Sequence, residues 1–195
     1  MRAKTLLVLV AAVVLLCAPM TFAQNLLSNG SFETGDYTSW TTGGNFEFSQ
    51  VVSGPFYVYT GAQDGSFYST MGPVSTDGTL SQSFADTAGQ GYTFSFYLAG
   101  VGDDPSDFSA YIDGTQVYGA TDPNTGGAWT LFSFSFTGTG ADTISFAFRD
   151  DPAYIALDNV SVTPNVQTVP EPSSFLLMGT GALALAGAIR RKLSR

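Results

Sequence analysis

The sequence predicts an all-β protein, a jelly-roll β-sandwich, from three observations. Apolar and polar residues alternate with a period of two in many short runs, as they do in strands that bury one face. Aromatic residues make up 14% of the 195 residues and charged residues only 12%, against roughly 25% charged residues in an average soluble domain. Breaks rich in Gly, Pro and Asp separate the runs, as turns separate short strands.

We expect the sandwich to occupy residues 24–163, a length sufficient to bury a core made largely of phenylalanine. Asp113-Gly114 lies between two alternating runs and predicts a tight hairpin. The runs that predict strands are, in chain order, 46–52, 56–60, 66–70, 79–84, 92–98, 108–112, 116–118, 132–136 and 144–148.

The last predicted strand, residues 155–162, contains a change of parity. Its first apolar residues, Ile155 and Leu157, are odd-numbered, whereas Val160 and Val162 are even-numbered. One extra residue at Asp158-Asn159 would produce this switch, which is the signature of a β-bulge. We therefore expect the Asp158 side chain to leave the regular ladder.

Residues 1–23 predict a secretory signal peptide. Arg2 and Lys4 precede an apolar run, and small residues lead up to Ala23, after which we expect signal peptidase to cleave. A permanent N-terminal anchor is the alternative, and the bulky residue before Cys17 argues against a lipid-modified cysteine. Loss of Cys17 with the signal would leave a mature domain without a disulfide.

Residues 169–195 predict a second targeting segment, separated from the sandwich by a short linker at 164–168. Val169-Pro170-Glu171-Pro172 precedes an apolar stretch at about 173–189 and a basic tail at 190–195. The core of this stretch would be about 22 Å long as a helix, and it can span the membrane if flanking residues extend it and the basic side chains snorkel. The positive-inside rule then places the tail in the cytoplasm and the sandwich outside.

The sorting motif, apolar helix and basic cluster resemble, in this order, the PEP-CTERM signal of Gram-negative bacteria. The resemblance covers Val169 to Arg195. It implies that an exosortase recognises the segment and removes the helix. The protein would then cross the inner membrane and be held there by the helix, or reach the cell surface after processing. Bacteria with this system often make exopolysaccharide and biofilm matrix.

The charge distribution excludes several classes of function. Fifteen acidic residues but only one basic residue, Arg149, lie between Gln24 and Val169, so the domain would repel nucleic acid. The chain has no histidine, which excludes Ser-His-Asp and Cys-His machinery. The acids gather in Asp- and Pro-containing segments typical of turns, at 103–105, 122–124 and 150–152. We therefore expect no enzyme, with a carboxylate-dependent glycoside hydrolase as the least favoured alternative.

The order of the elements also resembles the galactose-binding-like jelly rolls, which include many carbohydrate-binding modules. Segment 25–33 resembles their first strand, 91–96 their central strand and 155–162 their last. In that family a structural Ca²⁺ often joins a glutamate of the first strand to an aspartate of the last. The resemblance therefore makes Glu33 and Asp158 candidate calcium ligands, and a cation between them would relieve their repulsion. The alternative is that Asp158 caps the bulge through backbone hydrogen bonds.

Two tyrosines are candidates for ligand binding. Tyr97 and Tyr111 each fall on the parity opposite the apolar residues of their strands, so they face outward, where a ring can stack against a sugar. The alternative is that each lies against its neighbours. We therefore expect a module that binds extracellular polysaccharide, with a structural or adhesive matrix protein that has no specific glycan site as the alternative.

Overall fold

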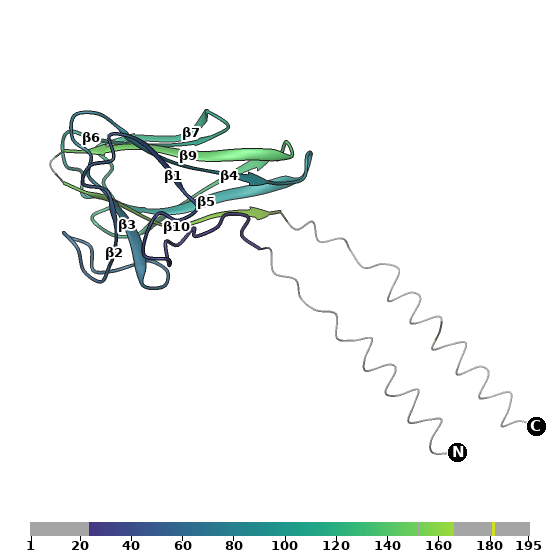
Figure 1. The fold of residues 1–195 in the computed structure, drawn as a ribbon, viewed down its shortest axis with the longest axis horizontal. Helices are drawn as coiled ribbons and strands as arrows, with labels where there is room; N and C mark the ends of the chain where they lie inside the picture. Colours follow the sequence, from purple (N-terminus) through teal and green to yellow (C-terminus); the bar gives the residue numbers. More distant parts are fainter. Residues whose placement is uncertain (1–23, 152, 166–180, 182–195) are drawn as a thin grey trace, which may run out of the picture. The chain divides into compact units, whose positions relative to one another are not determined.

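The computed structural model describes residues 24–151, 153–165 and 181. Residues 24–165 form a sandwich of two five-stranded antiparallel sheets (Figure 1), which confirms the predicted fold class. One sheet has the strand order β1-β4-β9-β6-β7 and the other has the order β2-β3-β10-β5-β8. The strands are β1 (Thr41–Gly44), β2 (Gln50–Ser53), β3 (Phe67–Met71), β4 (Gly78–Ala85), β5 (Gly91–Ala99), β6 (Ser106–Ile112), β7 (Thr115–Thr121), β8 (Thr130–Thr137), β9 (Ala141–Asp150) and β10 (Ile155–Pro164).

The core lies between the sheets and consists largely of phenylalanine. In β5 the even-numbered residues are buried and the odd-numbered residues up to Tyr97 are partly exposed, and β9 follows the same parity. Phe96 of β5 meets Phe146 of β9 edge to face, with ring centroids 5.3 Å apart. Phe108 of β6 lies against both rings, at 5.7 and 5.6 Å. The period of two in the sequence is thus the pattern of burial between two sheets.

The hairpin and the bulge predicted from the sequence are both present. Asp113 and Gly114 have φ angles of 48° and 75°, the two positive values that a type I′ turn between β6 and β7 requires. In β10 the register against β5 shifts between Asp158 and Ser161, and Asn159 has a φ of 47°. The parity change in the sequence therefore corresponds to a β-bulge.

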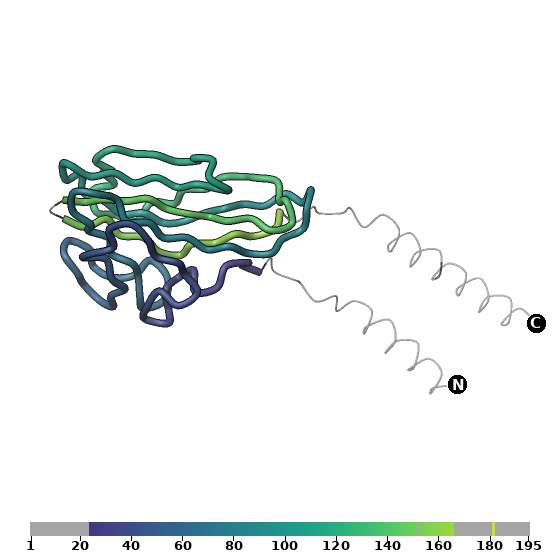
Figure 2. Tube along the Cα trace, turned by 45° about the horizontal axis from the view of Figure 1, so that its top comes forward, coloured from purple at the N-terminus to yellow at the C-terminus, as the bar shows by residue number. Residues whose placement is uncertain are grey.

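Three expectations for the N-terminal third were wrong. Residues 56–60 form a tight turn, in which Phe56 and Tyr59 exchange two backbone hydrogen bonds of 3.0 Å. The strand expected at 46–52 is the shorter β2, and β1 at Thr41–Gly44 was not expected. Segment 25–33 is irregular, although it runs beside β10, where the Leu26 N–H donates to the Val162 carbonyl (Figure 2).

The C-terminal end of the sandwich extends slightly further than the sequence indicated. Strand β10 continues to Pro164, and the Asn165 N–H donates to the carbonyl of Gly91. The expected signal peptide (1–23) and, apart from residue 181, the expected sorting segment (169–195) lie outside the described residues. Within the described part of the chain, the structure has no helix long and apolar enough to cross a membrane.

The Phe146 ring generates a stability prediction. Its side chain is fully buried, so Phe146→Ala should lower the free energy of unfolding by about 3–5 kcal/mol because it leaves a cavity in the core. Leu131→Ala is the control, since Leu131 of β8 is 52% exposed. Urea denaturation of residues 24–165, which contain every described strand and core residue, measures both variants. Equal losses in the two variants would contradict this account of the core.

Candidate functional site

Tyr97 lies on the outer face of the sheet that contains β10, β5 and β8. Its neighbours along β5, Phe96 and Leu98, are buried in the core, so the Tyr97 ring points away from it. In register with Tyr97 are Asp158 of β10 on one side and Leu131 of β8 on the other. The outward position predicted for Tyr97 is therefore found in the structure.

Hydroxyl side chains surround Tyr97 on this surface, which we call the Tyr97 face. The next outward row contains Ser161, Ser95 and Ser133, and the Ser95 and Ser161 hydroxyls are 2.8 Å apart. The row after it contains Thr163, Thr93 and Ser135. Beyond the tyrosine ring, the Tyr97 face is thus uncharged and rich in hydroxyls.

The connection between β2 and β3, residues 54–66, covers the neighbouring part of the same sheet. Under it lies a second aromatic cluster, in which Tyr59 and Trp129 stack with ring centroids 6.3 Å apart and Tyr68 meets Trp129 at 5.7 Å. The Trp129 indole N–H donates to the Gly61 carbonyl at 3.1 Å. This β2–β3 loop is therefore a packed layer beside the Tyr97 face.

Asp158 fastens the β2–β3 loop from below. Its side chain is fully buried, and its Oδ2 accepts backbone N–H bonds from Gln63 at 2.7 Å and from Asp64 at 3.0 Å. Its Oδ1 accepts from the Asn159 N–H at 2.6 Å. Burial raises the pKa of Asp158 to about 6, although the three N–H bonds oppose this rise.

Glu33 fastens the other end of the same stretch of the loop. Its Oε1 accepts N–H bonds from Ser66 and Phe67, both at 2.8 Å. A Cβ atom at Gly65, whose φ is +65°, would lie 2.4 Å from the Glu33 carboxyl carbon. Position 65 therefore requires glycine both for its backbone conformation and for the approach of the carboxylate.

The two candidate calcium ligands thus hold one loop. Both carboxylates accept backbone N–H bonds, the arrangement that the capping alternative for Asp158 describes. Asp64, whose backbone N–H donates to Asp158, also accepts from the Ser31 hydroxyl at 3.0 Å through its carboxylate. Among the described residues, no three His, Cys, Asp or Glu side chains form a group that could hold a metal. Calcium coordination by Glu33 and Asp158 stays a prediction.

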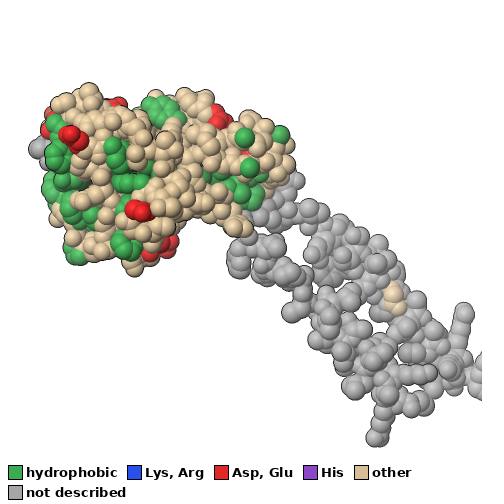
Figure 3. Space-filling view, viewed as in Figure 1, with side chains coloured by type: hydrophobic (Ala, Val, Ile, Leu, Met, Phe, Trp, Pro, Cys, Tyr) green, Lys and Arg blue, Asp and Glu red, His purple; other side chains and the backbone are tan. Residues whose placement is uncertain are grey.

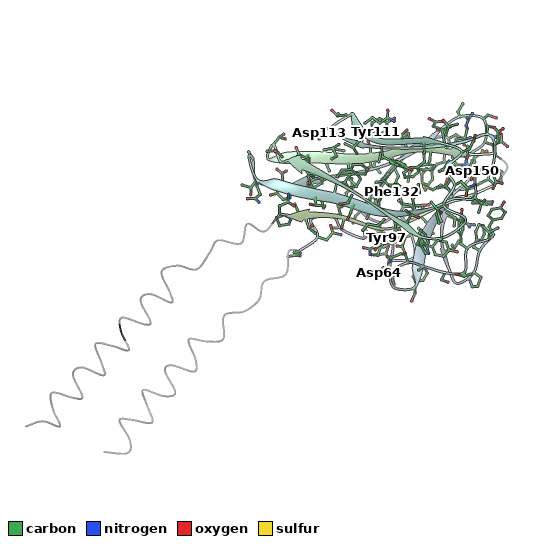
Figure 4. All side chains as sticks on the ribbon, turned by 180° about the vertical axis from the view of Figure 1, so that it is seen from behind. Asp64, Tyr97, Tyr111, Asp113, Phe132 and Asp150 are labelled. Atoms are coloured by element: carbon green, nitrogen blue, oxygen red, sulfur yellow. The ribbon has the colours of Figure 1, made fainter. Side chains whose placement is uncertain are left out.

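Tyr111 lies on the opposite surface of the sandwich. It belongs to β6, between the buried Ala110 and Ile112, and its neighbours in register are Gln116 and Ser145. Because β5 and β6 are in different sheets and both tyrosines point outward, Tyr97 and Tyr111 face away from each other (Figure 4). The two rings therefore belong to separate surfaces and cannot contact one ligand together.

The β2–β3 loop is the part of the site that the sequence reasoning missed. On the face drawn in Figure 3, apolar side chains gather over the end of the sandwich where β2 and β3 lie. Tyr57 and Val58, at the tip of the tight turn, are 52% and 48% exposed. Gly54 and Gly61 bound this aromatic run in the sequence, and this was the available signal for a loop instead of a strand.

Comparison with protein families finds a PEP-CTERM protein-sorting motif at residues 168–192. The match includes the predicted Val169-Pro170-Glu171-Pro172 and confirms that resemblance. The motif indicates a protein that is exported and anchored at the membrane before processing. Comparison with curated proteins finds no match.

The sandwich is similar to several solved structures. TmCBM61, solved in complex with β-1,4-galactotriose, has a TM-score of 0.61 and 18% identity over 73% of this chain and 100% of its own. The CBM22-1 xylan-binding domain of Paenibacillus barcinonensis Xyn10C has a TM-score of 0.52 and 20% identity, covering 75% and 97%. The K1 cleaved adhesin domain of Lys-gingipain from Porphyromonas gingivalis has a TM-score of 0.54 and 17% identity, covering 70% and 96%.

At these identities the likeness concerns the fold. The chain therefore combines a PEP-CTERM protein-sorting motif at its C-terminus with a jelly-roll sandwich of the kind found in carbohydrate-binding modules.

Proposed function

We propose that this exported protein binds a neutral extracellular polysaccharide through the Tyr97 face, without catalysing a reaction. The observation that carries the proposal is an outward tyrosine on a sheet surface whose next rows carry hydroxyls. A tyrosine ring can stack on the apolar face of a sugar, and Ser95, Ser133 and Ser161 can exchange hydrogen bonds with its hydroxyl groups.

Charge favours a neutral glycan over an acidic one. Arg149, the one basic residue between Gln24 and Val169, lies on β9 in the other sheet, and its guanidinium pairs with Asp107 at 3.1 Å. The Tyr97 face therefore offers no cation to a uronic acid or sulfated sugar, and the net negative charge of the domain opposes such ligands.

Affinity for immobilised neutral glycans tests this proposal. Tyr97→Ala should weaken binding about tenfold, equivalent to about 1.4 kcal/mol, because it removes the stacking platform. Tyr111→Ala is the matched variant on the opposite surface, where we predict a second, separate platform, and it should leave binding at the Tyr97 face unchanged. Binding lost only in Tyr111→Ala would move the site to the other sheet.

Absence of glycan binding in the wild-type domain would favour the adhesive alternative. In that case the exposed apolar tip formed by Tyr57 and Val58 would be the surface to examine. Hydrolysis of the bound glycan would instead revive the enzyme hypothesis, which would have to work with carboxylates and hydroxyls alone.

Processing at both ends is the second part of the proposal. We expect signal peptidase to leave a chain that begins near Gln24, and an exosortase to remove the segment after Val169 or leave it as the membrane anchor. Intact-mass analysis of the protein from the cell envelope measures both ends. Recovery of the uncleaved, full-length chain from the cytoplasm would contradict the expected export.

We also propose that calcium stabilises the β2–β3 loop through Glu33 and Asp158. The carboxylates lie at the two ends of backbone 63–67, and a cation that binds only the folded state raises its stability by mass action. Excess calcium should therefore raise the Tm of residues 24–165 relative to chelator. This rise should shrink in Asp158→Asn, which keeps an oxygen acceptor for the loop N–H groups. An undiminished rise in that variant would assign the effect to other residues.

A further inference from the structure

Three connections that contain aspartate lie together at one end of the sandwich, where the Asp122 N–H donates to the Ser106 carbonyl and the Asp151 N–H to the Pro105 carbonyl. They are the β5–β6, β7–β8 and β9–β10 connections, which contribute Asp103, Asp122 and Asp151, and Asp150 ends β9 beside them. Ser106 lies among them: it pairs with Asp150 across β6 and β9, its N–H donates to Asp122 Oδ1 at 3.0 Å, and its hydroxyl donates to the Asp103 carbonyl at 2.5 Å. We call this group the distal acidic cluster.

Asp150 is the unusual member of the distal acidic cluster. It ends β9 on the same inward parity as Phe146 and Phe148, and only 2% of its surface is exposed. Its Oδ1 is buried and has no hydrogen-bond partner in the described part of the chain. Burying a carboxylate oxygen without a hydrogen-bond partner lowers the stability of the folded state. A bound ligand that contacts this oxygen would remove that penalty.

The surroundings of Asp150 are negative. Burial and then repulsion from Asp103, Asp122 and Asp151 raise its pKa to about 7.

Within the described part of the chain, no basic side chain compensates this charge. Arg149 is the neighbour of Asp150 in β9, but its side chain is on the outer face, where it pairs with Asp107. The Tyr57 hydroxyl donates to Asp103 Oδ2 at 3.1 Å, which covers one carboxylate oxygen without adding positive charge. In Figure 4, Asp150 lies at the end of the sandwich opposite Asp113.

We propose that the distal acidic cluster binds a divalent cation, with Asp150 as the central ligand. Calcium takes six to eight oxygen ligands in flexible geometry, so Asp150 would supply its free oxygen, and Asp103, Asp122 and water would complete the shell. Among the described residues, no three acidic side chains are already grouped to hold a metal, so the proposal requires the Asp103 and Asp122 carboxylates to move toward Asp150 when the ion binds.

This site is separate from the loop held by Glu33 and Asp158. Asp150 belongs to β9 and faces the core, whereas Asp158 belongs to β10, in the other sheet, and lies under the β2–β3 loop. Loss of calcium binding at one site should therefore leave binding at the other unchanged, so Asp150→Asn and Asp158→Asn are controls for each other.

Calorimetric titration of residues 24–165 with calcium, followed by thermal unfolding in calcium and in chelator, tests the proposal. Calcium at 100 times its Kd should raise the Tm by about 5–10 °C. Asp150→Asn should bind one fewer calcium ion than the wild type and lose its share of this rise. In chelator the same variant should be at least as stable as the wild type near pH 7, because the buried charge is gone.

Two further variants complete the test. Asp104→Asn changes an exposed aspartate of the same connection and should keep the wild-type stoichiometry. Asp122→Asn retains an oxygen acceptor for the Ser106 N–H and should bind calcium more weakly, which keeps the proposal testable if Asp150→Asn does not fold. Unchanged stoichiometry and calcium response in Asp150→Asn, or unchanged calcium affinity in Asp122→Asn, would overturn the proposal.

Discussion

The contact between the Phe96 and Phe146 rings joins the two sheets, and the outer faces of both sheets depend on it. These rings hold β5 against β9, and β5 and β9 are each bonded on both sides within their own sheets. The outward residues of both strands, including Tyr97, take their directions from the inward phenylalanines. A domain expected to lack a disulfide thus relies on ring packing to keep its surface side chains in place.

A shortage of positive charge shapes the rest of the structure. With Arg149 already paired, several carboxylates of the domain take backbone N–H groups as partners instead. Glu33 and Asp158 thereby hold the β2–β3 loop, Asp122 holds the start of β6, and the Asp113 carboxylate accepts from the Thr143 N–H at 2.8 Å. Hydrogen bonds of this kind favour the ionised form, whereas the buried Asp150 Oδ1 receives none within the described residues.

The sequence predicted those parts of the fold in which burial and periodicity coincide. Strands β5 and β9 were predictable because each buries one face, which produces a clear alternation of apolar and polar residues. Strand β1, with the sequence TTGG, has no apolar residue and therefore no such alternation. Residues 56–60 misled because Phe56 and Tyr59 pack in the cluster under the β2–β3 loop instead of between the sheets, whereas Tyr57 is exposed. Parity predicted that Tyr97 and Tyr111 face outward, but not that their strands belong to different sheets. The sequence also places Asp150 on the inward parity of Phe146 and Phe148, but it does not show that three connections come together around this residue.

The position of β10 has a mechanical consequence. The chain leaves the sandwich toward the sorting motif from the end of β10, which lies in the middle of its sheet between β3 and β5. A pulling force between that exit and a ligand held at the far end of the sandwich would act along the strand. Its hydrogen bonds to both neighbours would then be loaded together in shear instead of opening one after another. An exported protein anchored in this way would resist drag through a central strand of its sheet.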